Sequence, residues 1–141
     1  RQAFHSVQDE RVDVLYLESD VLGYHPETHV LLLSPLLQKK EVFETFPVFS
    51  PDGRKLYFCT AEAKPIPAEY KEIRYSLCSI DFNPEDGTFG EKIDTLVNAA
   101  AMKKSISFPR PSYDGEYIMF TLSDFGNFSI WHKEADLWLL D

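Results

Sequence analysis

The chain has 141 residues, enough for one globular domain, and 44% of them are hydrophobic and 14% aromatic, as in a folded protein. Its 14 basic and 23 acidic residues give a net charge of −9, which disfavours nucleic acid and anionic membrane surfaces as partners because both require basic patches. The longest apolar stretch, at residues 30–37, is far shorter than the ~20 residues of a membrane-spanning helix, so no membrane span is expected.

The first predicted element is a hairpin at residues 22–30, where two short strands flank a Pro-Glu turn. A similar pattern returns at residues 80–89, with one inserted residue. His25 and His29 flank the first turn, but Pro follows the first histidine and Glu stands one place late for a His-Glu-x-x-His metal motif. The turn is therefore favoured over a metal site, and neither a metal nor another cofactor is expected.

The next element occurs twice, at residues 46–58 and 108–120, with an offset of 108 − 46 = 62 residues. Each copy begins with Phe-Pro, contains an Asp-Gly turn and continues into a run of aromatic and branched residues. This pattern predicts a strand, a tight turn and a second strand. The first turn has Pro51 at a position that the second turn gives to Tyr113.

Together these elements predict an all-β fold, namely a β-propeller of four-stranded antiparallel blades, of which this chain covers about two. The expected order is the last two strands of one blade (residues 1–37), a full blade (38–97) and the first three strands of the next (98–141). Because propellers close with typically four to eight blades, we expect the remaining blades to come from a longer parent chain or from another copy.

The two cysteines, Cys59 and Cys78, lie on strands that are expected to pair within the full blade. A cross-strand disulfide is one interpretation, and it would indicate an oxidising compartment. The favoured interpretation is two small buried hydrophobic side chains.

Residues 46–58, Phe-Pro-x-Phe-Ser-Pro-Asp-Gly-Arg-x-Leu-Tyr-Phe, resemble the signature of TolB-like β-propeller repeats, which are WD-repeat-like. The second copy departs from this signature at Tyr113 and Glu116 but keeps Phe-Pro and Asp-Gly. The resemblance implies a periplasmic or cell-surface protein of a Gram-negative bacterium. It also implies that the first strand of each blade lines a central channel and that one loop face carries ligands.

That loop face would comprise residues 38–45, 61–72, 98–105 and 123–134, and loops on a rigid scaffold often carry function. In the last of these loops, aromatic and polar side chains together suit a sugar ring or a peptide, although the aromatic residues could instead pack between blades. A charge at Arg110 on a channel-lining strand could bind a carboxylate or form a structural ion pair. Lysine pairs at 39–40 and 103–104 could form a basic rim or remain solvated. The candidate ligand-binding residues are Arg110, Phe128, Trp131, His132, Lys103 and Lys104.

The sequence thus favours a non-catalytic β-propeller module that binds a protein, peptide or glycan in the cell envelope. The alternative is the propeller part of an enzyme, such as the gating domain of a prolyl oligopeptidase-type peptidase or a propeller lyase or hydrolase. No Gly-x-Ser-x-Gly elbow or Gly-rich phosphate loop is present, and Ser50 and Ser112 are interpreted as turn residues.

Overall fold

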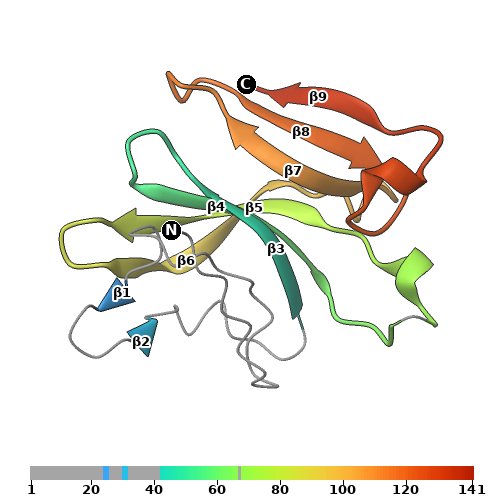
Figure 1. The fold of residues 1–141 in the computed structure, drawn as a ribbon, viewed down its shortest axis with the longest axis horizontal. Coiled ribbons are helices and arrows are strands. Elements are labelled where there is room, and N and C mark those ends of the chain that lie inside the picture. Colours follow the sequence, from blue (N-terminus) through green and yellow to red (C-terminus); the bar gives the residue numbers. More distant parts are fainter. Residues whose placement is uncertain (1–23, 26–29, 32–41, 67) are drawn as a thin grey trace, which may run out of the picture.

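The computed structural model describes residues 24–25, 30–31, 42–66 and 68–141, and these form an all-β structure with only two short 3-10 turns. Figure 1 shows two antiparallel sheets, of four and three strands, and a separate short hairpin. The hairpin consists of β1 (Tyr24–His25) and β2 (Val30–Leu31), which pair antiparallel, while the Pro-Glu turn predicted between them lies outside the described residues. His29 and the lysine pair at 39–40 lie outside the described residues.

Both sheets are simple meanders in which each strand pairs with the next strand along the chain. The first sheet consists of β3 (Val42–Phe49), β4 (Lys55–Glu62), β5 (Ser76–Asn83) and β6 (Thr88–Val97). The second sheet consists of β7 (Ser105–Pro111), β8 (Ile118–Ser123) and β9 (Asp136–Leu140). The 3-10 turns η2 (Tyr70–Glu72) and η3 (Ser129–Trp131) lie in the β4–β5 and β8–β9 loops.

The two Asp-Gly turns have the same hydrogen-bond pattern, which explains why their residues recur. Ser50 Oγ donates to Asp52 Oδ1 at 2.5 Å, and the same carboxylate oxygen accepts the Arg54 N–H at 3.1 Å. In the second copy, Ser112 Oγ donates to Asp114 Oδ1 at 2.5 Å, and Glu116 N–H donates to it at 3.1 Å. The glycines that follow have φ of 69° and 77°, a region that favours glycine. The prediction that both serines are turn residues is confirmed.

The Phe-Pro dipeptides form matching β-bulges, a feature that the sequence did not predict. Register shifts lie between Thr45 and Val48 in β3 and between Ser107 and Arg110 in β7. Two residues therefore oppose one on the partner strand, as in a bulge. Phe46 and Phe108 both have φ of 54°, a left-handed conformation that is rare for a non-glycine residue. The repeat thus conserves a backbone shape as well as a turn.

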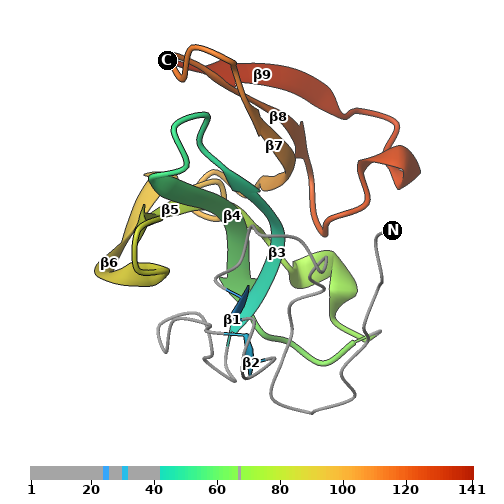
Figure 2. The same cartoon turned by 60° about the vertical axis from the view of Figure 1, so that its left-hand side comes forward.

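The second sheet packs on one face of the first, and the main core fills the space between them. Buried side chains of β4 and β5, including Cys59 and Leu77, meet Ile106, Phe120 and Leu122 of the second sheet. At the inner strands, the Phe46 and Phe108 rings contact each other with centroids 4.4 Å apart. From β3 and β7 the sheets diverge toward their outer strands, β6 and β9 (Figures 1 and 2).

The cysteines lie on opposite faces of the first sheet, so the disulfide interpretation is wrong. Cys59 pairs with Leu77, whereas Cys78 pairs with Phe58 on the neighbouring register position. Because successive side chains of a strand point to opposite faces, Cys59 belongs to the core between the sheets and Cys78 to a second cluster with Leu56. Both thiols are free and buried, as the favoured interpretation predicted.

Candidate functional site

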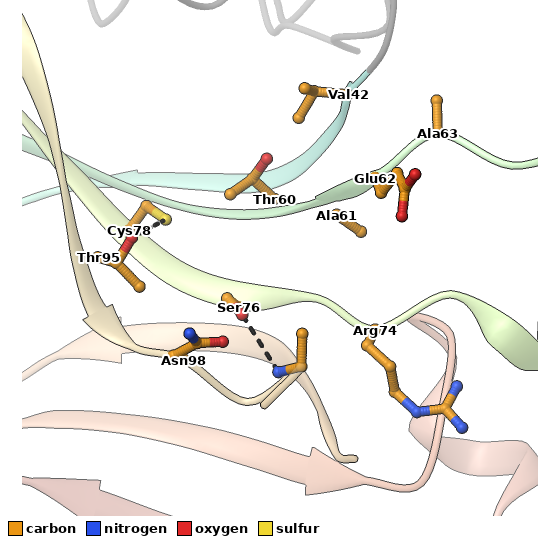
Figure 3. A pocket seen from close by; sticks show the side chains of 11 residues that line it. Val42, Thr60, Ala61, Glu62, Ala63, Arg74, Ser76, Cys78, Thr95 and Asn98 are labelled. Carbon is orange, nitrogen blue, oxygen red and sulfur yellow. Dashed lines mark hydrogen bonds between the residues drawn. The ribbon is translucent and has the colours of Figure 1, made fainter. Parts of the chain in front are cut away.

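A pocket of about 710 Å³ opens at the end of the first sheet where the β4–β5 and β6–β7 loops begin (Figure 3). It lies at two of the loops predicted to form the ligand-carrying face. Its volume is in the range of about 300–1,000 Å³ that is usual for small-molecule pockets. The pocket is lined by Val42, Thr60, Ala61, Glu62, Ala63, Arg74, Ser76, Cys78, Thr95, Asn98 and Ala100.

The floor of this pocket comes from neighbouring strands that place short polar side chains on one face. Thr60 pairs with Ser76, and Cys78 pairs with Thr95, so these four side chains share a face. It is the face of the Leu56 cluster, opposite the second sheet. The hydroxyl groups of the floor can donate and accept hydrogen bonds, and a polar ligand requires both.

Two hydrogen bonds from backbone N–H groups to side chains fix the wall formed by the β6–β7 loop. Ser76 Oγ accepts the Ala100 N–H at 3.3 Å, and Figure 3 shows this bond across the pocket. Asn98 Oδ1 accepts the Ala101 N–H at 3.1 Å, which holds the amide at the loop start. The wall is therefore attached to the floor.

Arg74 supplies the positive charge of the pocket, and the chain holds its guanidinium in place. One terminal nitrogen, Nη1, donates to Lys71 O at 2.6 Å and to Ile73 O at 3.1 Å. The guanidinium carbon lies 5.9 Å from the centroid of the Phe125 ring, within cation–π range. Neither Nη2 nor Nε has an acceptor among the described residues, so these donors remain for a carboxylate, phosphate or sugar hydroxyl.

Cys78 contributes a neutral thiol to the pocket. Burial raises the pKa of Cys78, and a weak hydrogen bond links its Sγ to Thr95 Oγ1 at 3.8 Å. A thiol with a raised pKa is a poor nucleophile at neutral pH, because the thiolate is the reactive form. The pocket therefore combines this thiol with walls that can form hydrogen bonds.

The two long loops that carry aromatic residues pack on each other beside Arg74. Tyr70 Oη donates to Asn127 Oδ1 at 3.3 Å and accepts the Asn127 N–H at 3.2 Å. The Tyr70 and Phe125 rings meet edge to face at 6.0 Å, and Phe125 in turn meets His132 at 4.4 Å. Gly126 N–H donates to Ile73 O at 2.9 Å. These contacts support the alternative in which Phe125 joins neighbouring repeats.

The predicted ligand residues of the second sheet lie outside this pocket. Arg110 is on β7 as predicted, is exposed and forms no ion pair with a described residue. Phe128 is 45% exposed at the start of η3, and the Trp131 side chain lies outside the described residues. His132 is half-buried against Phe125, and its Nε2 is buried without a partner among the described residues.

The two predicted lysines differ in their surroundings. Lys103 is exposed, with φ of 55° in the β6–β7 loop. Lys104 Nζ lies 2.7 Å from Asp124 Oδ1, an ion pair between loops of the second sheet. Through this hydrogen bond the Asp124 carboxylate raises the pKa of Lys104, and the Lys104 ammonium lowers the pKa of Asp124. Because both groups are exposed, the pair contributes little to stability.

A second cavity, of about 690 Å³, lies at the opposite end of the strands between the two Asp-Gly turns. Its walls include Asp52, Asp114, Arg54 and the exposed ring of Tyr113. Two of its other residues, Lys55 and Asp81, bind each other at 2.5 Å. Its turn carboxylates already accept hydroxyl and backbone hydrogen bonds.

Arg74 lines the pocket but is not among the residues that the sequence predicted as ligand contacts. The sequence offers little indication of its place, because Arg74 is one of several charged residues in the β4–β5 loop and no motif surrounds it.

No family model matches the chain, and no curated protein or solved structure is significantly similar to it. In the part of the chain that the structure describes, no group of three or more His, Cys, Asp or Glu side chains is placed to hold a metal ion. None of the described helices has the length and apolar character needed to cross a bilayer.

Proposed function

We propose that the chain is part of a β-propeller module that binds a protein, peptide or glycan partner in the Arg74 pocket. The observation that carries this proposal is a pocket at the loop end of a repeated sheet, lined by hydroxyl groups, the Glu62 carboxylate, small apolar side chains and the Arg74 guanidinium. In a rigid scaffold of this kind, loops and strand ends commonly carry ligand contacts.

The architecture supports the propeller part of the proposal in three ways. The two sheets have the same meander order, the same bulge and the same Asp-Gly turn. Their first strands, β3 and β7, contact each other. The sheets then diverge outward, as blades around an axis do (Figures 1 and 2).

The ligand would present an anionic or hydroxyl-rich group to Arg74. Its guanidinium is uncommitted on one side, while Thr60, Ser76 and Thr95 supply hydroxyl groups nearby. A peptide carboxylate, an acidic side chain or an acidic sugar satisfies this chemistry. Together with the TolB-like signature, it favours a partner in the periplasm or at the cell surface.

A direct test screens the full chain against arrays of acidic peptides and acidic oligosaccharides and measures the affinity of each positive ligand for variants. Arg74→Ala is expected to weaken binding by at least about tenfold, the loss typical of a charged hydrogen bond of ~1.5–3 kcal/mol. The matched control, Arg110→Ala, removes an exposed arginine outside the pocket and is expected to leave affinity unchanged. Equal loss in both variants, or none in Arg74→Ala, would contradict the proposal.

A further inference from the structure

The cavity between the two Asp-Gly turns lies at the end of the strands opposite the Arg74 pocket. It has a volume of about 690 Å³, and both repeats contribute residues to its walls. The turns approach each other closely, because a Cβ added at Gly115 would lie 3.9 Å from Pro51 Cδ. The volume is in the range usual for pockets that bind small molecules. Two successive repeats therefore form this cavity jointly.

Two tyrosines supply the aromatic surface of this cavity. The Tyr113 side chain is 99% exposed and makes no ring contact or hydrogen bond with another described residue, so its whole ring is open to a ligand. Tyr57 is half-buried against the main core. Burial raises the pKa of Tyr57, so its hydroxyl group stays protonated at neutral pH and can donate a hydrogen bond. A tyrosine ring combines an apolar face with a polar tip, a combination that is enriched at binding surfaces.

The polar walls contain both acceptors and donors that the fold leaves unused. Asp52 and Asp114 each use Oδ1 for the turn hydrogen bonds, whereas Oδ2 of each accepts no hydrogen bond from another described residue. The Arg54 guanidinium donates to no acceptor and forms no ion pair among the described residues. Lys55 and Asp81, by contrast, bind each other. The cavity therefore offers free carboxylate oxygens and free guanidinium donors together.

This mixture of charges favours a neutral ligand that is rich in hydroxyl groups. An anion would meet the Asp52 and Asp114 carboxylates, and a cation would meet the Arg54 guanidinium, so part of the wall opposes either charge. A sugar hydroxyl group can donate to a carboxylate and accept from a guanidinium, and it meets no such opposition. The weakly polar face of a sugar ring can in turn lie on the open ring of Tyr113.

We propose that this cavity binds a neutral saccharide, with Tyr113 as the stacking surface and the Arg54 guanidinium and the two turn carboxylates as hydrogen-bonding groups. The site is separate from the Arg74 pocket, which is proposed to take an anionic or hydroxyl-rich group of a ligand. Neutral saccharides and acidic ligands should therefore bind at opposite ends of the strands.

The test screens the full chain against an array of neutral oligosaccharides, built from hexoses and N-acetylhexosamines, and against basic peptides. The affinity of the tightest neutral saccharide is then measured for variants. Tyr113→Ala is expected to weaken binding by about three- to tenfold, the loss typical of an aromatic contact. Arg54→Ala is expected to weaken it by about tenfold, because a charged hydrogen-bond donor is lost. Tyr117→Ala, which removes an exposed ring near the same turn but outside the cavity, is the matched control and should leave the affinity unchanged.

Amide chemical-shift mapping locates the bound saccharide, and the largest shifts are expected at residues 52–55 and 113–115. Failure of every neutral oligosaccharide to bind would overturn the proposal, and so would binding of basic peptides alone at these residues. Equal losses in Tyr113→Ala and Tyr117→Ala would also overturn it. Arg74→Ala separates the two sites: loss of saccharide binding in this variant would overturn the proposal, whereas failure of acidic ligands to bind would overturn only the proposed Arg74 pocket.

Discussion

At the scale of single residues, the repeated Ser-x-Asp-Gly turns show why a few positions recur while their neighbours vary. The serine hydroxyl and a backbone N–H both donate to one carboxylate oxygen, and glycine takes the positive φ. Tyr113 stands where the first copy has Pro51. The residue type can differ here because the Tyr113 side chain is fully exposed and takes part in none of these hydrogen bonds. The recurring residues are therefore explained by turn geometry.

These turns predict a pH dependence of stability. The hydroxyl of Ser50 lowers the folded-state pKa of Asp52, and Ser112 does the same for Asp114. The carboxylates therefore stabilise the fold above their unfolded-state pKa of about 3.9, and this contribution is lost as the pH falls through the lower folded-state pKa. The double variant Asp52→Asn/Asp114→Asn should be less stable than the native chain at neutral pH, and this deficit should be smaller at about pH 2, because the native carboxylates take up protons as the pH falls through their folded-state pKa. Urea unfolding at both pH values measures this, and an equal deficit at both would contradict it.

Gly126 predicts a second effect at this scale. A Cβ added at Gly126 would lie 2.2 Å from Tyr70 Oη, and its φ is 64°. At Gly53, φ is 69° but nothing lies within 4 Å of an added Cβ. Gly53→Ala should therefore cost about 1–2 kcal/mol for the left-handed backbone alone. Gly126→Ala should cost roughly 1–3 kcal/mol more, because Tyr70 must move. Equal losses in urea unfolding would show that the two loops do not pack as described.

At the scale of elements, the bulged strands β3 and β7 contact each other where the two sheets meet. Each has a left-handed Phe before a Pro, and the two rings meet at the inner edge of the interface. Such backbone conformations are costly and persist where surrounding contacts determine them. The contact between the Phe46 and Phe108 rings shows that the neighbouring repeat supplies such contacts to each bulge.

The Phe46–Phe108 pair should therefore be energetically coupled. A double-mutant cycle with Phe46→Ala and Phe108→Ala is expected to give a coupling of about 0.5–1.5 kcal/mol, typical of an aromatic pair. Phe46→Ala with Phe128→Ala serves as the control cycle, because Phe128 lies in the β8–β9 loop rather than at the bulge contact. Additive effects in the first cycle would mean that the rings do not join the sheets.

The cysteines yield a further prediction for the first sheet. Because Cys59 and Cys78 lie on opposite faces, both should titrate as free thiols in denaturant, with or without prior reduction. In the native protein both should react slowly, since burial raises the pKa of each thiol. Recovery of two thiols only after reduction would contradict the register of β4 and β5.

The strands and turns of this fold were predictable because local residues determine them. Asp-Gly and Pro-Glu turns separated apolar runs, and the 62-residue offset gave the order. The bulges were not predictable, since Phe before Pro ordinarily favours extended backbone and only the ring contact between repeats accounts for φ of 54°. The place of Arg74 in the pocket was not predictable for a similar reason, because the Phe125 ring beside its guanidinium comes from the next repeat. Packing between loops decides which residues line the pocket, and the local sequence does not reveal that packing.

At the scale of the whole molecule, two successive sheets share one core, and the first sheet carries the candidate pocket. The central proposal is that ligands bind at the Arg74 pocket rather than at the aromatic loop of the second sheet. Amide chemical-shift mapping by NMR, with an acidic peptide or oligosaccharide selected from the arrays, tests this claim most directly. The largest shifts are expected at Thr60, Arg74, Ser76 and Thr95. Largest shifts at residues 128–132, with those four unchanged, would contradict it.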